Sequence, residues 1–215
     1  MICVSVGNID AGECMERLSG LELAEVRLDT MDVDPVSVRA MFSLPLRLVA
    51  TCRPGRYSDV QRLDLLSTAI KAGAAYVDVE TDAATGFREE IRGLASRHSV
   101  QLIVSYHNYR ETPGARRLQK MIRDAFSSGA HLVKIACMVN RPVENLRLLD
   151  LLGMKAHAGR LIVVGMGEAG RITRVASVFL GSPFTYACHD DDGPYAPGQM
   201  SVRRLRKAME LIENG

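Results

Sequence analysis

Long apolar runs, a surplus of one charge and clustered cysteines are all missing from this 215-residue chain. No stretch approaches the roughly 18 consecutive apolar residues that a membrane span requires. Met1 leads directly into a strand-like segment, without the basic and apolar regions of a signal peptide. Lysine plus arginine number 27 and aspartate plus glutamate 25, and both signs are spread along the chain, so the basic stripe typical of nucleic-acid binding is absent. We therefore expect a cytoplasmic protein without membrane or nucleic-acid partners.

The cysteines are few, odd in number and widely separated. They are Cys3, Cys14, Cys52, Cys137 and Cys188, mostly within apolar runs. This spacing indicates neither a disulfide framework nor a zinc site, and we interpret the cysteines as small core residues in a reducing compartment. Linkers and low-complexity stretches are also missing, so we expect one domain over residues 1–215.

Short strand-like runs alternate along the whole chain with segments of helical periodicity. The predicted strands are Ile2–Val6, Leu23–Leu28, Arg47–Cys52, Ala75–Glu80, Gln101–Tyr106, Leu132–Cys137, Leu161–Gly165 and Thr185–Cys188. Helical segments include Asp59–Ala72, Arg116–Ser127, Val143–Ala156, Arg171–Phe179 and Ser201–Ile212, and Gly73, Gly129 and Gly159 follow three of them as predicted left-handed caps. Eight strand and helix signals in alternation predict an α/β fold, a single-domain (β/α)₈ TIM barrel.

Polar side chains interrupt the apolar strands at alternating positions. The second strand places Glu25, Arg27 and Asp29 on one face, opposite an apolar face that suits packing against helices. The same parity groups Thr51 with Arg53, Asp78 with Glu80, and Ser105 with His107 on the next three strands. Ionisable residues from several strands are thus predicted to point into the barrel near the carboxyl ends of the strands, where barrel enzymes place their sites.

Lys134 is the most informative of these residues. It lies between Leu132 and Ala136 on its face of the sixth strand, where an unpaired ammonium ion would be costly. A buried ion-pair network that only fixes strand register is the structural alternative, but such networks are themselves costly. We therefore favour a functional role for the lysine. His98, His131 and His157 fall in helix or loop contexts, and we assign them no role.

Five motifs occur in the order seen in one enzyme family. They are Glu25-Val26-Arg27, Thr51-Cys52-Arg53, Ser105-Tyr106-His107-Asn108, Val133-Lys134-Ile135-Ala136 and Ala196-Pro197-Gly198-Gln199, with Met166, Gly170 and Thr173-Arg174 after the seventh strand. In this arrangement the chain resembles the type I 3-dehydroquinate dehydratases over nearly its whole length. The resemblance implies a hydro-lyase that converts 3-dehydroquinate to 3-dehydroshikimate in the shikimate pathway, with neither metal nor cofactor.

The resemblance also implies a role for each site residue. Lys134 would form an imine with the substrate ketone, and His107 would act as general base and then as general acid. Arg174 and Gln199 would bind the substrate carboxylate and its neighbours. Glu25, Arg27 and Arg53 would contact the hydroxyl groups, and a lid containing Tyr195 and Ala196 would close over the substrate. The amphipathic outer helices would also allow a homodimer.

The chain departs from the family pattern at two places. Tyr57 stands where the family has a glutamate that orients the catalytic histidine, and we expect Asp78 or Glu80 to take that role. Tyr195 stands where the family has serine, after an acidic run His189-Asp190-Asp191-Asp192 that we interpret as a solvated turn rather than a metal site.

The sequence also allows three alternative functions: a dinucleotide-binding protein, a class I aldolase and a disabled ligand-binding barrel. Gly165, Gly167 and Gly170 spell a dinucleotide-binding fingerprint, but they lie before the last strand rather than at the start of a domain, so we interpret them as a substrate-admitting loop. A class I aldolase would use the same lysine on the same barrel, yet it would not require Arg174 or the Ala196–Gln199 motif. A disabled ligand-binding barrel would be expected to lose Lys134 or His107 first, and both are present.

Overall fold

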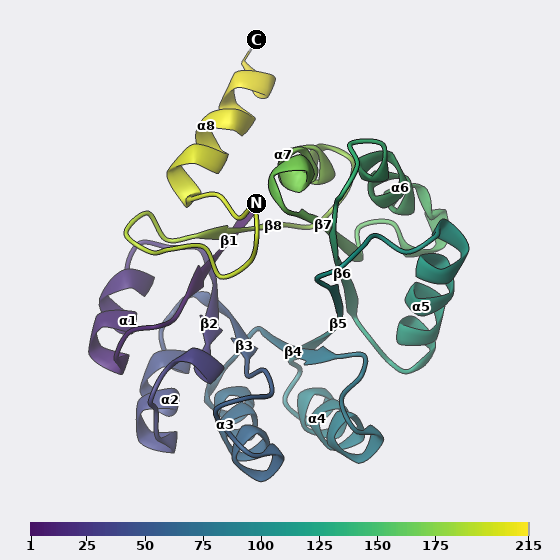
Figure 1. The fold of residues 1–215 in the computed structure, drawn as a ribbon. Helices are drawn as coiled ribbons and strands as arrows, with labels where there is room; N and C mark the ends of the chain where they lie inside the picture. The colour runs from purple at the N-terminus through teal and green to yellow at the C-terminus, as the bar shows by residue number, and fades with distance from the viewer. Residues whose placement is uncertain (215) are drawn as a thin grey trace. The chain divides into compact units, whose positions relative to one another are not determined.

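A computed structural model describes residues 1–214 of the chain. Eight strands alternate with helices along the sequence (Figure 1). The strands are β1 (Ile2–Val6), β2 (Leu23–Arg27), β3 (Arg47–Thr51), β4 (Tyr76–Glu80), β5 (Gln101–Asn108), β6 (Leu132–Met138), β7 (Leu161–Met166) and β8 (Thr185–Cys188). Every predicted strand is therefore present, with its ends within two residues of the prediction.

The helices follow the strands in turn. They are α1 (Ala11–Leu18), α2 (Pro35–Phe42), α3 (Asp59–Ala72), α4 (Thr85–Arg97), α5 (Ala115–Ser127), α6 (Glu144–Asp150), α7 (Arg171–Phe179) and α8 (Val202–Glu213). Short 3₁₀ turns are η1 (Leu28–Thr30), η2 (Leu151–Gly153), η3 (Lys155–His157) and η4 (Glu168–Gly170). The predicted left-handed glycines are confirmed, because Gly73, Gly129 and Gly159 have φ angles of 118°, 97° and 71°, but only Gly73 and Gly129 follow α-helices, since Gly159 comes after the 3₁₀ turn η3.

One predicted helix is wrong in length. The helix expected over Val143–Ala156 ends as α6 at Asp150 and continues as the turns η2 and η3. Between these two turns Met154 has a φ of −71° and a ψ of 90°, which lies outside the helical region. Gly153 precedes it, and glycine is a poor helix former, so the apolar periodicity outlasts the helix itself.

The strands form one eight-stranded sheet in the order β7-β6-β5-β4-β3-β2-β1-β8, and β7 and β8, at the two ends of that order, also contact each other. Parallel pairing places Arg27 beside Thr51, Thr51 beside Asp78 and Lys134 beside Ile162. This arrangement is a nearly closed (β/α)₈ barrel, which confirms the predicted fold class.

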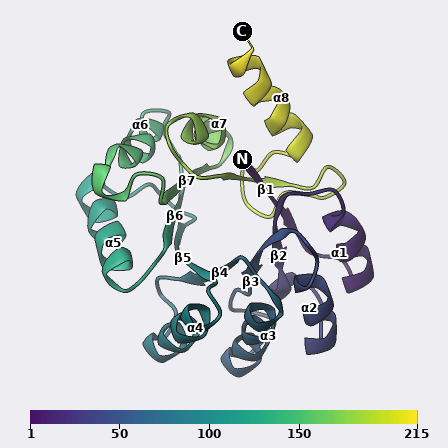
Figure 2. The same ribbon diagram turned by 180° about the vertical axis from the view of Figure 1, so that it is seen from behind.

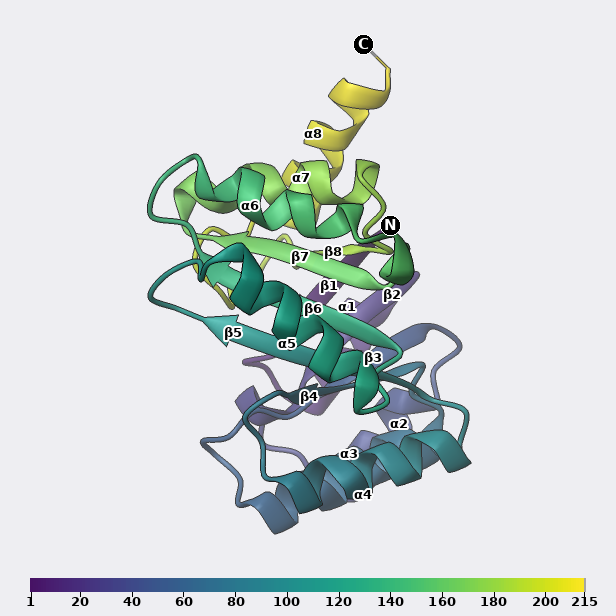
Figure 3. The ribbon, with the colours of Figure 1, turned by 90° about the vertical axis from the view of Figure 1, so that its right-hand side faces the viewer.

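Two compact units make up the described chain. The first contains Met1–Val4 and the chain from Ser105 onward, and the second contains Ser5–Val104. In the first unit β5, β6 and β7 lie side by side, with α5 and α6 outside them (Figures 1 and 3). In the second unit α1 to α4 lie outside β2 to β4 (Figure 2), and α3 lies beside α4 and contacts it (Figures 1 and 3).

Local interactions explain why the elements of the second unit begin and pack where they do. Ser58 and Gln61 form a reciprocal capping box at the start of α3. The buried guanidinium of Arg62 joins α3 to its neighbours: it donates to the carbonyl of Cys52 at 3.0 Å and lies 4.7 Å from the ring centre of Phe87 on α4. The five cysteines are buried free thiols, as predicted. None of the helices in the described chain is both long enough and apolar enough to span a membrane.

Candidate active site

Lys134 lies deep within the first unit. Its side chain projects from the middle of β6, and the residue is only 5 % exposed. The amine nitrogen lies 4.4 Å from the ring centre of Tyr186 on β8, over the face of the ring. Tyr186 is equally buried, and its ring makes an edge-to-face contact with Phe184. The lysine amine therefore faces one of two aromatic rings that pack against each other.

Arg174 is the second buried cation of this unit. It projects from α7 and is 1 % exposed. Its Nη1 donates to the carbonyl of Tyr186 at 3.3 Å and its Nη2 to the carbonyl of Pro197 at 3.5 Å, both long contacts. The Nε atom has no hydrogen-bond partner within residues 1–214, and none of the described carboxylates pairs with the guanidinium. Burial lowers the pKa of Arg174 to about 10, which shows how poorly its charge is compensated.

Tyr186 therefore contacts both Lys134 and Arg174. Its ring faces the amine of Lys134, while its main-chain oxygen accepts a hydrogen bond from Arg174. The sequence predicts functional roles for Lys134 and Arg174 but none for Tyr186, because an aromatic residue in an apolar strand is usually a core residue. The polar hydroxyl in the short strand that follows Phe184 was the only signal available.

The lid residues come together in one hydrogen-bonded turn after β8. Gln199 Oε1 accepts from the backbone N–H of Tyr195 at 2.8 Å, and the backbone N–H of Gln199 donates to the carbonyl of Ala196 at 3.1 Å. The Tyr195 hydroxyl donates to Asp192 at 2.9 Å. Tyr195 thus stabilises this turn through both its backbone and its side chain.

The acidic run before the lid also has structural contacts. Asp190 accepts from the backbone N–H of Arg203 at the start of α8, and Asp191 donates its own N–H to His189. The pKa of Asp190 lies below its ordinary value. Burial is the strongest single effect and raises the pKa, but the opposing effects, including the hydrogen bonds to Ser201 and Arg203, outweigh it. No group of three or more histidine, cysteine, aspartate or glutamate residues within residues 1–214 is arranged to hold a metal ion.

Gly165 in β7, Gly167 in the loop that follows and Gly170 in η4 allow close backbone contacts. A Cβ on Gly170 would overlap the backbone of Gly165, so β7 and η4 touch at these two positions. A Cβ on Gly198 in the lid would overlap the carbonyl oxygen of Gly167, and the N–H of Gly167 donates to the carbonyl of Pro197 at 3.0 Å. Of the glycines that resemble a dinucleotide fingerprint, Gly167 therefore contacts the segment of Pro197 and Gly198, whereas Gly165 and Gly170 contact each other.

His107 lies near the end of β5, two residues after the fully buried Ser105. Its ring is half-buried and stacks on Tyr109, with ring centres 6.1 Å apart and planes 15° apart. Asn108 fixes the loop that follows, because its Oδ1 accepts from the backbone N–H groups of Arg110 and Glu111. The imidazole thus belongs to the same unit as Lys134, on the strand next to β6.

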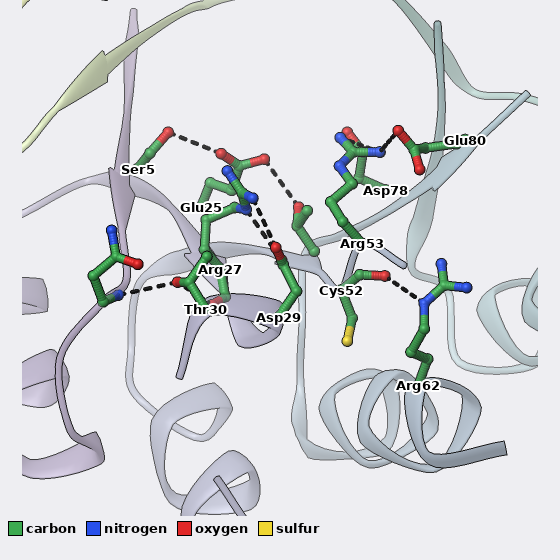
Figure 4. A network of polar contacts seen from close by, with 12 residues as sticks. Ser5, Glu25, Arg27, Asp29, Thr30, Cys52, Arg53, Arg62, Asp78 and Glu80 are labelled. Carbon is green, nitrogen blue, oxygen red and sulfur yellow. Dashed lines mark hydrogen bonds and ion pairs between the residues drawn. The ribbon is translucent and has the colours of Figure 1, made fainter. Parts of the chain in front are cut away.

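A polar network occupies the second unit (Figure 4). Glu25 is 5 % exposed and accepts hydrogen bonds from the hydroxyls of Ser5 at 2.8 Å and Thr51 at 2.9 Å. Arg27 binds Asp29 through two nitrogens, at 3.1 and 2.7 Å. The parity prediction that groups these side chains on the polar face of β2 is consistent with these contacts.

Arg53 connects β3 to β4 in the same network (Figure 4). Its guanidinium pairs with Asp78 at 3.1 Å and Glu80 at 3.2 Å. Burial tends to lower the pKa of Arg53, but the two carboxylates, with help from Glu25, outweigh it and raise the pKa above its ordinary value. Asp78 and Glu80, which we expected to orient His107, are thus both partners of Arg53.

Tyr57 has a structural contact where the family has its glutamate. Its hydroxyl donates to the carbonyl of Met31 at 2.7 Å and accepts from the backbone N–H of Val33 at 3.1 Å. Arg56, beside it, pairs with Asp32 at 3.3 Å. The loop after β3 is therefore tied to the loop after β2, which carries Asp29, the partner of Arg27.

Comparisons with known proteins agree on one family. Residues 2–215 match the type I 3-dehydroquinase family. The 3-dehydroquinate dehydratase of Desulfotalea psychrophila is 34% identical over 95% of each chain, and that of Pyrococcus abyssi is 32% identical over 94% of each. The crystal structure of the enzyme from Geobacillus kaustophilus, 25% identical, superposes with a TM-score of 0.86 over 99% of this chain and 91% of that one. The chain belongs to the type I 3-dehydroquinases, a family of hydro-lyases.

Proposed function

We propose that this protein dehydrates 3-dehydroquinate to 3-dehydroshikimate through a Schiff base on Lys134, as a cytoplasmic step of the shikimate pathway. Its relatives from Desulfotalea and Pyrococcus are named 3-dehydroquinate dehydratases. The observation that carries the proposal is the arrangement around Tyr186, which places the buried Lys134 amine against its ring and the uncompensated Arg174 cation on its carbonyl. A keto acid needs both groups: an amine for its ketone and a cation for its carboxylate.

Lys134 and His107 divide the chemistry between them. The unprotonated amine adds to the ketone, and loss of water from the adduct gives an iminium that withdraws electrons from the neighbouring carbon. His107 removes a proton from that carbon, which leaves an enamine. The enamine expels the β-hydroxyl group, which takes the proton from the histidine and leaves as water. Hydrolysis of the remaining iminium releases the conjugated ketone and restores the amine, so one molecule of water is lost overall.

The remaining residues would hold the substrate in place. Arg174 would bind the carboxylate with the planar fork of its guanidinium, whose Nε is not engaged by the described residues. Gln199, Tyr195 and Ala196 belong to the lid, which is tied by Pro197 to both Gly167 and Arg174. By the family pattern we assign contacts with the substrate hydroxyls to Glu25, Arg27 and Arg53. No metal and no cofactor takes part in the proposed reaction.

Trapping the imine tests this function directly. The protein is incubated with 3-dehydroquinate, the conjugated product is followed by ultraviolet absorbance, and the protein is weighed by mass spectrometry after borohydride reduction. We expect turnover and a covalent adduct, both lost in Lys134→Ala and both kept in Lys120→Ala, whose side chain is 72% exposed on α5. An adduct without the conjugated product would favour an aldolase, and neither signal would favour a disabled ligand-binding barrel.

A further inference from the structure

Tyr186 is buried against the amine of Lys134, and nothing in the reaction scheme yet uses its ring. The ring face lies 4.4 Å from the lysine nitrogen, well within the range of a cation–π interaction. Because Tyr186 is only 5 % exposed, the contact is largely shielded from water. Cation–π interactions are strongest when water is excluded in this way.

We propose that Tyr186 is a positioning residue whose ring stabilises the positive charge that the Lys134 nitrogen carries in the iminium intermediates of the reaction. The inference rests on the proposed Schiff-base function and deepens it. The iminium carries its positive charge at the same nitrogen that faces the ring, so the attraction continues after the covalent bond forms. In addition, the ring fixes the end of a flexible four-carbon side chain, which would otherwise sample several rotamers.

The neighbours of Tyr186 hold the ring in that position. Phe184, which comes directly before β8, meets the tyrosine ring edge-on, with ring centres 5.6 Å apart and planes 67° apart. The carbonyl of Tyr186 is held by Arg174 from α7. The main-chain contact to Arg174 does not depend on the side chain at position 186, so changing the ring should alter the chemistry at Lys134 more than carboxylate binding.

The test changes the electronic character of the ring while keeping its shape. Phenylalanine and then its 4-fluoro, 3,5-difluoro and 3,4,5-trifluoro derivatives are placed at position 186 by site-specific incorporation, since each fluorine withdraws electron density from the ring face. The readouts are kcat, KM and the initial rate of borohydride-trapped adduct formation with 3-dehydroquinate. The trifluoro derivative placed at Phe179 on α7, which is 42% exposed, is the matched control.

Our inference predicts that the Tyr186→Phe variant keeps most of the wild-type activity, because it keeps the ring. Across the fluorine series kcat and the adduct rate should fall stepwise by about 10-fold in total, which corresponds to a cation–π contribution of about 1.4 kcal/mol. KM should change little, and the Phe179 control should match the wild type. Flat rates across the series would overturn the role of the ring, whereas absence of any adduct in the wild type would instead refute the proposed Schiff-base function.

Discussion

At the scale of single residues, burial of the charged Arg174 side chain lowers the stability of the fold. Its guanidinium is buried with only two long contacts to carbonyl groups, and burial lowers its pKa to about 10. Because the charged form is disfavoured in the folded state, the penalty is present below pH 10 and is lost as the pH rises above the folded-state pKa toward the ordinary pKa of arginine. At neutral pH the shift corresponds to a cost on the order of 3 kcal/mol.

Replacing this residue should therefore separate stability from function. We expect Arg174→Met to have a melting temperature equal to that of the wild type or a few degrees above it, because relief of the buried charge offsets the lost hydrogen bonds. The KM for 3-dehydroquinate should rise at least about 100-fold, as expected when a charge-assisted pair is lost. Scanning calorimetry and steady-state kinetics measure the two effects. Arg171→Met, on the same helix but half exposed, should leave both unchanged. A strongly destabilised Arg174→Met protein would show that the arginine serves the fold.

Tyr57 joins the loop after β3 to the loop after β2. Its hydroxyl makes two hydrogen bonds to the backbone of the loop after β2, at Met31 and Val33. Tyr57→Phe removes both and leaves the ring, so we expect a loss of about 1 to 2 kcal/mol in the free energy of unfolding. Urea denaturation measures this loss, and Tyr109→Phe, which removes a hydroxyl from a more exposed ring, serves as the comparison. Unchanged stability would show that the loop does not depend on this tie.

At the scale of elements, the lid depends on glycine contacts with the loop after β7. Gly198 has a φ of 75°, and a Cβ there would overlap the carbonyl oxygen of Gly167. We expect Gly198→Ala to displace the lid and raise KM about 10-fold or more, since side chains rarely adopt this conformation and the loops would have to separate. Gly193→Ala lies in the same segment with open space around its Cβ, so it should behave as the wild type. Equal kinetics for the two variants would rule out a role for the contact in substrate binding.

Sequence patterns determine the strands better than the helices between them. Short apolar or β-branched runs predict all eight strands, and parity places Glu25 and Lys134 among the buried polar residues, where the structure has them. The helix after β6 is overestimated, because apolar spacing continues through the turns η2 and η3. The helices α1, α2 and α4 could not be delimited in the same way, since two of them have only eight residues and short segments carry weak periodicity.

The residues of the candidate site also differ in whether the sequence can predict them. Residues whose role depends on strand parity or on a family motif can be predicted, as for Arg53 or His107. Tyr186 cannot, because its importance comes from a contact between β6 and β8, 52 residues apart in the sequence. The role of Gly167 likewise depends on a lid segment about 30 residues later. Periodicity carries no information about contacts of this kind.

At the scale of the whole molecule, the boundaries of the two compact units fall inside strands. One boundary divides β1 between Val4 and Ser5, and the other divides β5 between Val104 and Ser105. The first unit also consists of two separate pieces of chain. Since a strand does not unfold by halves, we propose that residues 1–215 behave as the single domain expected from the sequence.

Calorimetry with a bound carboxylate tests this proposal. We expect one transition, with equal calorimetric and van't Hoff enthalpies of about 150 kcal/mol near 60 °C for a chain of this length. Saturating 3-dehydroshikimate should move that whole transition upward, because a ligand that binds only the folded state stabilises every part that unfolds with it. Arg174→Met should lose the shift. If the two units unfolded independently, the ligand would move only the part of the heat absorption that belongs to the unit with Lys134 and Arg174. The van't Hoff enthalpy would then fall to about half of the calorimetric value.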